Sequence, residues 1–140
     1  MKFLILLVFS IQIALVSSES PAEKDYKGFA IAVLKSTIAK NFDILHADFE
    51  SFDSDGVIKK KSDHIKEGID DEAISYAKEK LKTLLNGGTF DWKKVNVQFT
   101  RDGLLYIRNH ENDGKLSSVK LAIRDSSIEG GYKMYRYVTV

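Results

Sequence analysis

The apolar residues of this chain change their spacing at Gly87 and Gly88, and that change limits the folds it can adopt. Before the two glycines, apolar residues recur every three or four positions, as they do along amphipathic helices. After them, apolar and polar residues alternate, as they do along half-buried strands. Helices followed by strands predict an α+β fold, because a parallel α/β sheet would need helices and strands to alternate.

The first helix is expected over about residues 21–49. Ser20, Pro21 and Glu23 form a capping-box sequence with proline in the first turn, which is typical of a helix start. Seven apolar or aromatic side chains then recur at three- or four-residue steps and predict one buried stripe. These are Tyr26, Ala30, Leu34, Ile38, Phe42, Leu45 and Phe49.

The second helix is expected to follow Asp70, a good N-cap residue, and to end at Leu85 before the glycine pair. Between the two helices, residues 50–68 are polar, and we expect a loop there with at most a short helical turn. The two helices are thus expected to be joined by a connection without strands.

Four strands are expected after the glycine pair, and short turns that contain glycine separate them. Their approximate ranges are 95–100, 104–109, 118–124 and 132–140. Neighbouring strands joined by such short turns pair antiparallel. The expected architecture is therefore two N-terminal helices packed on a four-stranded antiparallel β-meander, in a single α+β domain over residues 19–140.

Residues 1–18 have the pattern of a secretory signal peptide. Lys2 gives the positive start, an almost unbroken apolar run follows from Phe3 to Val16, and cleavage is expected after Ser18. The run is short for a membrane-spanning helix, which needs about 20 apolar residues. The protein is therefore expected to be secreted, without a stable membrane anchor.

The composition of residues 19–140 restricts what a secreted domain of this kind can do. It has no cysteine and no Asn-x-Ser/Thr site, so we expect a disulfide-free and non-glycosylated protein held together by its core alone. Loss of Lys2 with the signal leaves equal numbers of basic and acidic residues. A balanced charge argues against nucleic acid as a partner, because such binding needs a basic excess.

No motif for catalysis or metal binding is complete. Asp53, Asp55 and Gly56 resemble the front of an EF-hand loop, but Ser62 stands where a bidentate glutamate is needed. The sequence has no nucleophile elbow, phosphate loop or dinucleotide fingerprint. The histidines are scattered, at His46, His64 and His110. We therefore expect no catalytic residue, metal site or cofactor, although an enzyme stays open as an alternative.

The most informative surface is the predicted outer face of the sheet. If Val119, Leu121 and Ile123 face the helices, the two-residue period turns their neighbours outward. The resulting face would be rich in cations and tyrosines without a carboxylate, a composition suited to protein interfaces. The candidate binding residues are Tyr106, Arg108, Lys120, Arg124, Lys133, Tyr135 and Tyr137. An ordinary solvated sheet face is the alternative, and the register of the last strand stays open.

A helix followed by a meander resembles the cystatin fold in topology. The inhibitory Gln-x-Val-x-Gly hairpin is replaced here by Thr100-Arg101-Asp102-Gly103, and the Pro-Trp pair is absent. We expect a secreted, non-enzymatic binding protein of salivary, venom or effector type that acts through a protein–protein surface. Two alternatives stay open: an extracellular small-ligand carrier with a pocket between helices and sheet, and a protease inhibitor of cystatin-like topology.

Overall fold

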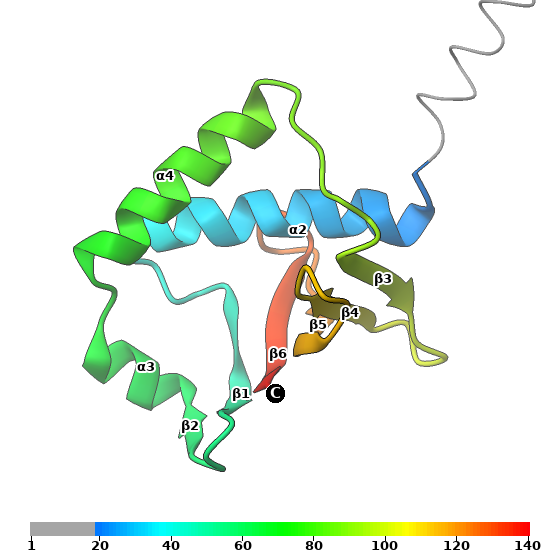
Figure 1. Cartoon of the computed structure of the whole chain (residues 1–140). Helices are drawn as coiled ribbons and strands as arrows, with labels where there is room; N and C mark the ends of the chain where they lie inside the picture. The colour runs from blue at the N-terminus through cyan, green and yellow to red at the C-terminus, as the bar shows by residue number, and fades with distance from the viewer. Residues whose placement is uncertain (1–18) are drawn as a thin grey trace, which may run out of the picture.

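The computed structural model describes residues 19–140. The expected secretion signal, residues 1–18, lies outside the described residues, so secretion stays a prediction. Within the described part, one mixed sheet of six strands packs against three helices (Figure 1). The helices are α2 (Pro21–Ile38), α3 (Lys61–Glu67) and α4 (Asp71–Leu85). None of them is long and apolar enough to cross a membrane.

Both predicted helix starts are confirmed by their caps. At the start of α2, the Ser20 hydroxyl accepts from the Glu23 amide at 3.1 Å, and the Glu23 carboxylate accepts from the Ser20 amide at 2.8 Å. At the start of α4, the Asp70 carboxylate accepts from the Ala73 amide at 2.8 Å. Each side chain satisfies backbone donors that the first helical turn leaves free.

The sheet has the strand order β2-β1-β6-β5-β4-β3. All neighbouring strands are antiparallel except β1 and β6, which are parallel. The strands are β1 (Leu45–Phe52), β2 (Ile58–Lys60), β3 (Val95–Phe99), β4 (Leu105–His110), β5 (Leu116–Arg124) and β6 (Tyr132–Thr139).

The predicted two helices on a four-stranded antiparallel meander are therefore wrong. Strands β3 to β6 do form a meander, but β1 and β2 extend the sheet beyond β6 and bring in a parallel pair. The short helix α3 adds a third helix to the two expected. The likeness to the cystatin fold was based on the purely antiparallel meander and fails with it.

The error arises in the predicted helix over 21–49, which ends early and whose last five residues belong to β1. α2 ends at Ile38, and Lys40 has a positive φ of 54°, which a continuing helix does not allow. Leu45 and Phe49 are four residues apart, a spacing that fits one face of a helix and also one face of a strand. The apolar spacing alone therefore cannot separate the two structures at this point.

The core lies between the helices and one face of the sheet. Phe29 of α2 is buried against Tyr132 of β6, with ring centroids 6.2 Å apart and nearly perpendicular planes. Leu105 and Ile107 of β4 are fully buried in the same cluster. Its members are Ala22, Tyr26, Phe29, Ala32, Ile44, Phe49, Leu105, Ile107, Ala122, Tyr132 and Met134.

Candidate interaction face and cavities

The two faces of the sheet follow from the strand pairing, because directly paired residues project to the same side. Leu105 pairs with Ala122, and both are fully buried, so they define the inner face toward the helices. Ile107 pairs with Lys120, which places this lysine on the inner face as well. The opposite side of the sheet, the outer face, is not part of the helix–sheet core.

Strand β5 presents its aliphatic residues to the outer face, against the sequence prediction. Val119 pairs with Arg108, and Leu121 pairs with Tyr106, so both lie on the side away from the core. Ile123 follows the same alternation and pairs with Lys133. All three aliphatic side chains are half-buried and lie outside the core cluster. The prediction that they face the helices is wrong.

The physical reason is that β5 is positioned by its neighbours and not by its own hydrophobicity. Its fully buried inner residue is Ala122, which belongs to the same cluster as the bulky Phe29 and Ile107. The core volume above Ala122 is thus filled from α2 and the adjacent strand. A bulkier aliphatic side chain at position 122 would overfill that close-packed part of the core.

The seven predicted binding residues are not brought together on one face. Four lie on the outer face: Tyr106, Arg108, Lys133 and Tyr135. The other three belong to the inner side, by pairing with inner-face residues of β6 and β5: Lys120, Arg124 and Tyr137. The single patch predicted from the alternation is therefore split by the sheet itself.

A bulge in β6 divides its two candidate tyrosines. Ala122 pairs with Met134 and Leu121 pairs with Arg136, so Tyr135 is the extra residue between the two pairs. The bulge lets Tyr135 stay beside Arg136, whose guanidinium carbon lies 3.9 Å from the centroid of the tyrosine ring. Tyr137 then returns to the inner face, opposite Lys120.

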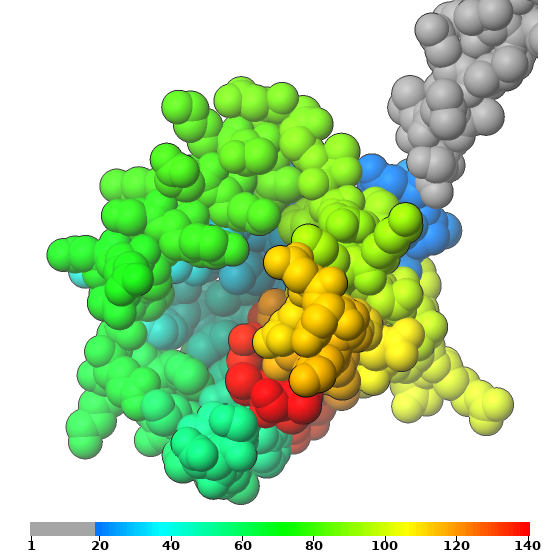
Figure 2. Space-filling view, in the orientation of Figure 1, coloured from blue at the N-terminus to red at the C-terminus, as the bar shows by residue number. Residues whose placement is uncertain are grey.

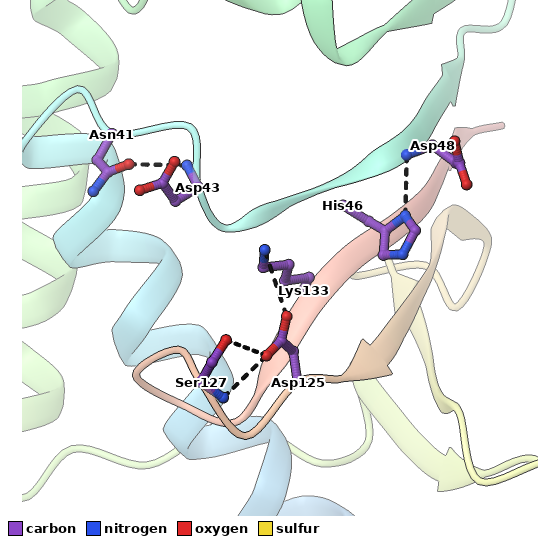
Figure 3. A network of polar contacts seen from close by, with 7 residues as sticks. All are labelled: Asn41, Asp43, His46, Asp48, Asp125, Ser127 and Lys133. Atoms are coloured by element: carbon purple, nitrogen blue, oxygen red, sulfur yellow. Dashed lines mark hydrogen bonds and ion pairs between the residues drawn. The ribbon is translucent and has the colours of Figure 1, made fainter.

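Most cations around the outer face already have a carboxylate partner. Arg136 pairs with Glu50 at 3.4 Å, and Lys133 pairs with Asp125 at 3.4 Å. Figure 3 shows Asp125 held between Lys133 and Ser127. The Ser127 hydroxyl and amide, and then Lys133, lower the pKa of the Asp125 carboxyl. The turn after β5 thus fixes Lys133 in place.

Arg108 differs from its neighbours on the outer face. One guanidinium nitrogen, Nη2, donates to the Asn96 side chain at 2.8 Å, while Nε is buried without a hydrogen-bond partner. No carboxylate of the described chain lies within 4.0 Å of this guanidinium, which is 5.8 Å from the ring centroid of Tyr106. Its charge is therefore available to an external group.

Arg124 is the last residue of β5, on the inner face of the sheet, and it contacts α2. It forms an ion pair with Asp25 of α2 at 3.6 Å. Its guanidinium carbon is 5.5 Å from the ring centroid of Tyr132 and 5.8 Å from that of Phe99. Asp25 also accepts a 2.6 Å hydrogen bond from the Tyr132 hydroxyl, so these groups fasten α2 to the sheet.

An apolar cavity of about 260 Å³ lies between the end of α2, β1 and α3. Figure 2 shows a hollow in the surface between the green α3–α4 segment and the red β6, with cyan atoms at its floor. The only polar pair described in its wall is Ser51 and His64, whose Oγ and Nε2 atoms are 2.9 Å apart. The apolar wall residues include Phe42, Ile44, Leu45, Phe49, Ile69 and Met134.

A second cavity of about 260 Å³ lies between α2, α4 and the inner face of β3 to β5. Lys120 lines this cavity from β5, and Lys80 lines it from α4. Burial lowers the pKa of the Lys120 ammonium. The sequence prediction included Lys120 as a surface cation, and only the pairing of β5 reveals it as a cavity residue.

The EF-hand-like segment forms the turn between β1 and β2. The Asp53 carboxylate accepts from the backbone amides of Asp55 and Val57, both at 2.9 Å, and Gly56 has a positive φ of 80°. Asp53 therefore shapes a hairpin turn. Among residues 19–140, no three His, Cys, Asp or Glu side chains are grouped closely enough to hold a metal ion.

Comparison with known proteins does not assign this chain to a family. No family model matches the chain, and no curated protein matches it. The crystal structure of the S. rosetta CaMKII hub overlaps 87% of this chain and 97% of that chain, with 16% identity and a TM-score of 0.42. At that score and identity, the likeness does not transfer the hub's properties to this chain.

Proposed function

We propose that this is a secreted, non-enzymatic binding protein whose outer sheet face docks against another protein. The observation that carries the proposal is the row of Val119, Leu121 and Ile123 on the side of the sheet that the core does not use. A sheet face in water normally carries polar residues in that position. Secretion is supported by the sequence of residues 1–18.

The aliphatic row is placed where an interface centre would be. Strand β5 lies between β6 and β4, away from both edges of the sheet. Tyr106 lies beside Leu121, and Arg136 lies on its other side. Tyrosine and arginine around an apolar centre are the residue types that dominate binding energy in protein interfaces.

The charges indicate the kind of partner. Strands β4, β5 and β6 contain no aspartate or glutamate, whereas Arg108 keeps a guanidinium without a carboxylate partner in the described chain. A matching protein surface would therefore have an apolar centre and carboxylates beside it. A contiguous apolar row that is partly accessible to solvent and not covered by the core is typical of protein-interaction sites.

The test is hydroxyl-radical footprinting of the mature protein, alone and in the extracellular fluid of the tissue that makes it. We expect Tyr106, Leu121 and Tyr135 to lose reactivity in the fluid, while the exposed Leu85 at the end of α4 keeps it. Leu121→Glu and Arg108→Glu should each restore the reactivity of the outer face. Val57→Glu, which changes an exposed residue at the β1–β2 turn, is the matched control and should not.

Unchanged reactivity of the outer face in the fluid would overturn the proposal, and so would protection that both outer-face variants retain. Protection that is already present in the purified protein, together with a dimer in sedimentation, would replace the proposed partner by a second copy of the chain. Circular dichroism of each variant separates loss of binding from loss of folding.

Carriage of a small apolar ligand is the second candidate, and the apolar cavity between α2, β1 and α3 favours it. An apolar fluorescent probe should brighten on binding there. Ser36→Trp places a large ring in the wall and should abolish the signal, whereas Ser75→Trp on the exposed face of α4 should not. Equal signals from both variants would exclude this cavity as the site.

A further inference from the structure

We propose that the cavity between α2, α4 and β3 to β5 binds a small organic acid, with its carboxylate on the Lys120 ammonium and its apolar part against the helices. This site faces the opposite side of the sheet from the proposed protein-binding face, and it does not depend on that proposal. Four observations support it: the state of Lys120, the second cation, the apolar wall and the cavity size.

Lys120 is a cation without an anion. It pairs across the sheet with Ile107, which is fully buried, and with Tyr137. Its Nζ lies 5.4 Å from the ring centroid of Tyr137, and no hydrogen bond or ion pair to Nζ is formed within residues 19–140. Burial of an unpaired charge is unfavourable, so an anion that enters the cavity would offset the free-energy cost of burying the Lys120 ammonium.

The polar part of the cavity wall supplies donors and positive charge, without a carboxylate. Lys80 of α4, an exposed lysine, contributes a second cationic side chain to the wall. Asn109 contributes an amide whose oxygen accepts from the Ser118 hydroxyl at 3.3 Å, which leaves its NH₂ group free to donate. Tyr26 and Tyr76, which each carry a hydroxyl, also line the cavity. This combination suits an anion and disfavours a cation.

The remaining wall is apolar, which selects an acid with a hydrophobic body over a bare inorganic anion. The rings of Tyr26 and Phe90, which both line this wall, are 5.0 Å apart between centroids and tilted by 57°. The cavity of about 260 Å³ lies just below the range of about 300–1,000 Å³ typical of drug-sized ligands, so the acid has to be small. The other apolar wall residues are Ala30, Leu34, Leu84 and Val95.

Trp92 provides a natural reporter for this site. It is the single tryptophan of the chain, and its ring is 6.2 Å from Tyr26 and 5.5 Å from Phe90, which both line the cavity. A ligand that displaces either ring should change the tryptophan fluorescence. The signal needs no label and no knowledge of the natural ligand.

The experiment titrates the mature protein with octanoate, with octanol as the uncharged analogue and with inorganic phosphate as the bare anion. Trp92 fluorescence and calorimetry report affinity, and NMR shifts report position. We expect octanoate to bind more tightly than octanol or phosphate. The NMR shifts should centre on Lys120 and Asn109.

Lys120→Met keeps most of the length of the unbranched side chain and removes its charge. Since hydrogen bonds to charged groups are worth about 1.5–3 kcal/mol, octanoate should bind at least about tenfold more weakly, with octanol affinity little changed. Lys115→Met in the exposed β4–β5 turn is the matched control and should leave both affinities unchanged. Leu121→Glu on the outer face should also leave octanoate binding intact, which keeps this test separate from the docking test.

Three results would overturn the proposal: no octanoate binding at millimolar concentration, equal affinity for octanoate and phosphate, or an unchanged octanoate affinity in folded Lys120→Met. NMR shifts confined to the α2–β1–α3 cavity would also contradict it, because the acid would then bind elsewhere. The shift map is recorded on the unmodified protein, so the test stands even if the variant fails to fold.

Discussion

Leu105 and Ile107 on the inner face of β4 are fully buried in the core, whereas Leu121 on the outer face of β5 is half-buried and lies outside the core cluster. The same inner face also holds Lys120, a lysine among core residues. Each face thus carries one feature that hydrophobic patterning would assign to the other. Such local departures from the pattern are expected at binding sites more than elsewhere.

The difference between the faces is a difference in what already surrounds each side chain. Inner-face residues lie in a close-packed cluster in which a lost methylene leaves a cavity. Outer-face residues such as Leu121 lie outside that cluster and gain full burial only when another surface covers them. The inner face therefore determines stability, and the outer face is free to serve binding.

The largest expected effect comes from truncating the inner face. Ile107→Ala should lower the free energy of unfolding by about 2–5 kcal/mol, because it removes a fully buried side chain from the core. Leu121→Ala on the outer face should cost about 1 kcal/mol, since that side chain is already partly in water. Urea unfolding of both variants measures the contrast, and equal losses would show that the outer face is also core.

A backbone change where the β5–β6 turn meets α2 should be next in size. Gly130 has a φ of +83°, and an added Cβ would lie 2.8 Å from the Cβ of Ala32. Gly130→Ala should cost about 3 kcal/mol, from left-handed strain and from overpacking against the helix. Gly114→Ala has a similar φ of +85° with open space around it and should cost only about 1–2 kcal/mol.

Thermal or urea unfolding of the two glycine variants isolates the packing term, because the backbone strain is nearly the same in both. If both variants lose equal stability, the turn does not press on α2 as closely as the distance indicates.

Burial of Tyr26 on the inner side should make the stability of the fold depend on pH in the alkaline range. Burial, and to a lesser extent Tyr76, raises the pKa of Tyr26 from 10.0 to about 12. Above pH 10 the unfolded chain releases this proton while the folded protein keeps it, so stability falls between pH 10 and pH 12. Tyr26→Phe should remove about 2–3 kcal/mol of that fall.

Urea unfolding between pH 9 and pH 12 measures the Tyr26 effect, with Tyr106→Phe on the outer face as the matched control. Part of the alkaline loss should remain in Tyr26→Phe, because burial and the hydrogen bond to Asp25 also raise the pKa of Tyr132 to about 12. A pH profile identical to that of the unmodified protein would contradict the burial of the Tyr26 hydroxyl.

The smallest effect should be a gain. Lys120→Met replaces a partly buried, unpaired ammonium by an apolar side chain of similar length and should stabilise the fold by about 1 kcal/mol. Lys133→Met, on the outer face, removes a cation that pairs with Asp125 and should change stability by less than about 1 kcal/mol. A clear loss of stability in Lys120→Met would mean that its contact with Tyr137 outweighs the cost of burial.

Local signals predicted the helix starts and the four later strands. Ser20 and Asp70 cap their helices as their sequences indicate, because the hydrogen bonds involved span only three residues. The alternation after residue 94 likewise found β3 to β6, since short glycine turns connect them. Such features need only neighbouring residues to form.

Long-range pairing could not be predicted in the same way. β1 joins the sheet through parallel pairing with β6, and Arg136 donates to the carbonyl of Asp48 across 88 positions of the sequence. No local pattern in β1 predicts its pairing with β6, because the spacing of Leu45 and Phe49 fits a helix equally well. The faces of the seven candidate residues could not be predicted for the same reason, because alternation along a strand does not show which face meets the helices.

The sequence by itself determined where α2 and α4 begin, where the strand period starts and that no disulfide supports the fold, because these depend on residue identity and near neighbours. Only the tertiary structure decided which alternate residues of β5 face the helices. A strand offers two faces with equal geometry. The pairing of Ile107 with Lys120 places this lysine at a cavity on the inner face, and it places Val119, Leu121 and Ile123 on the outer face. Both candidate sites follow from that single register.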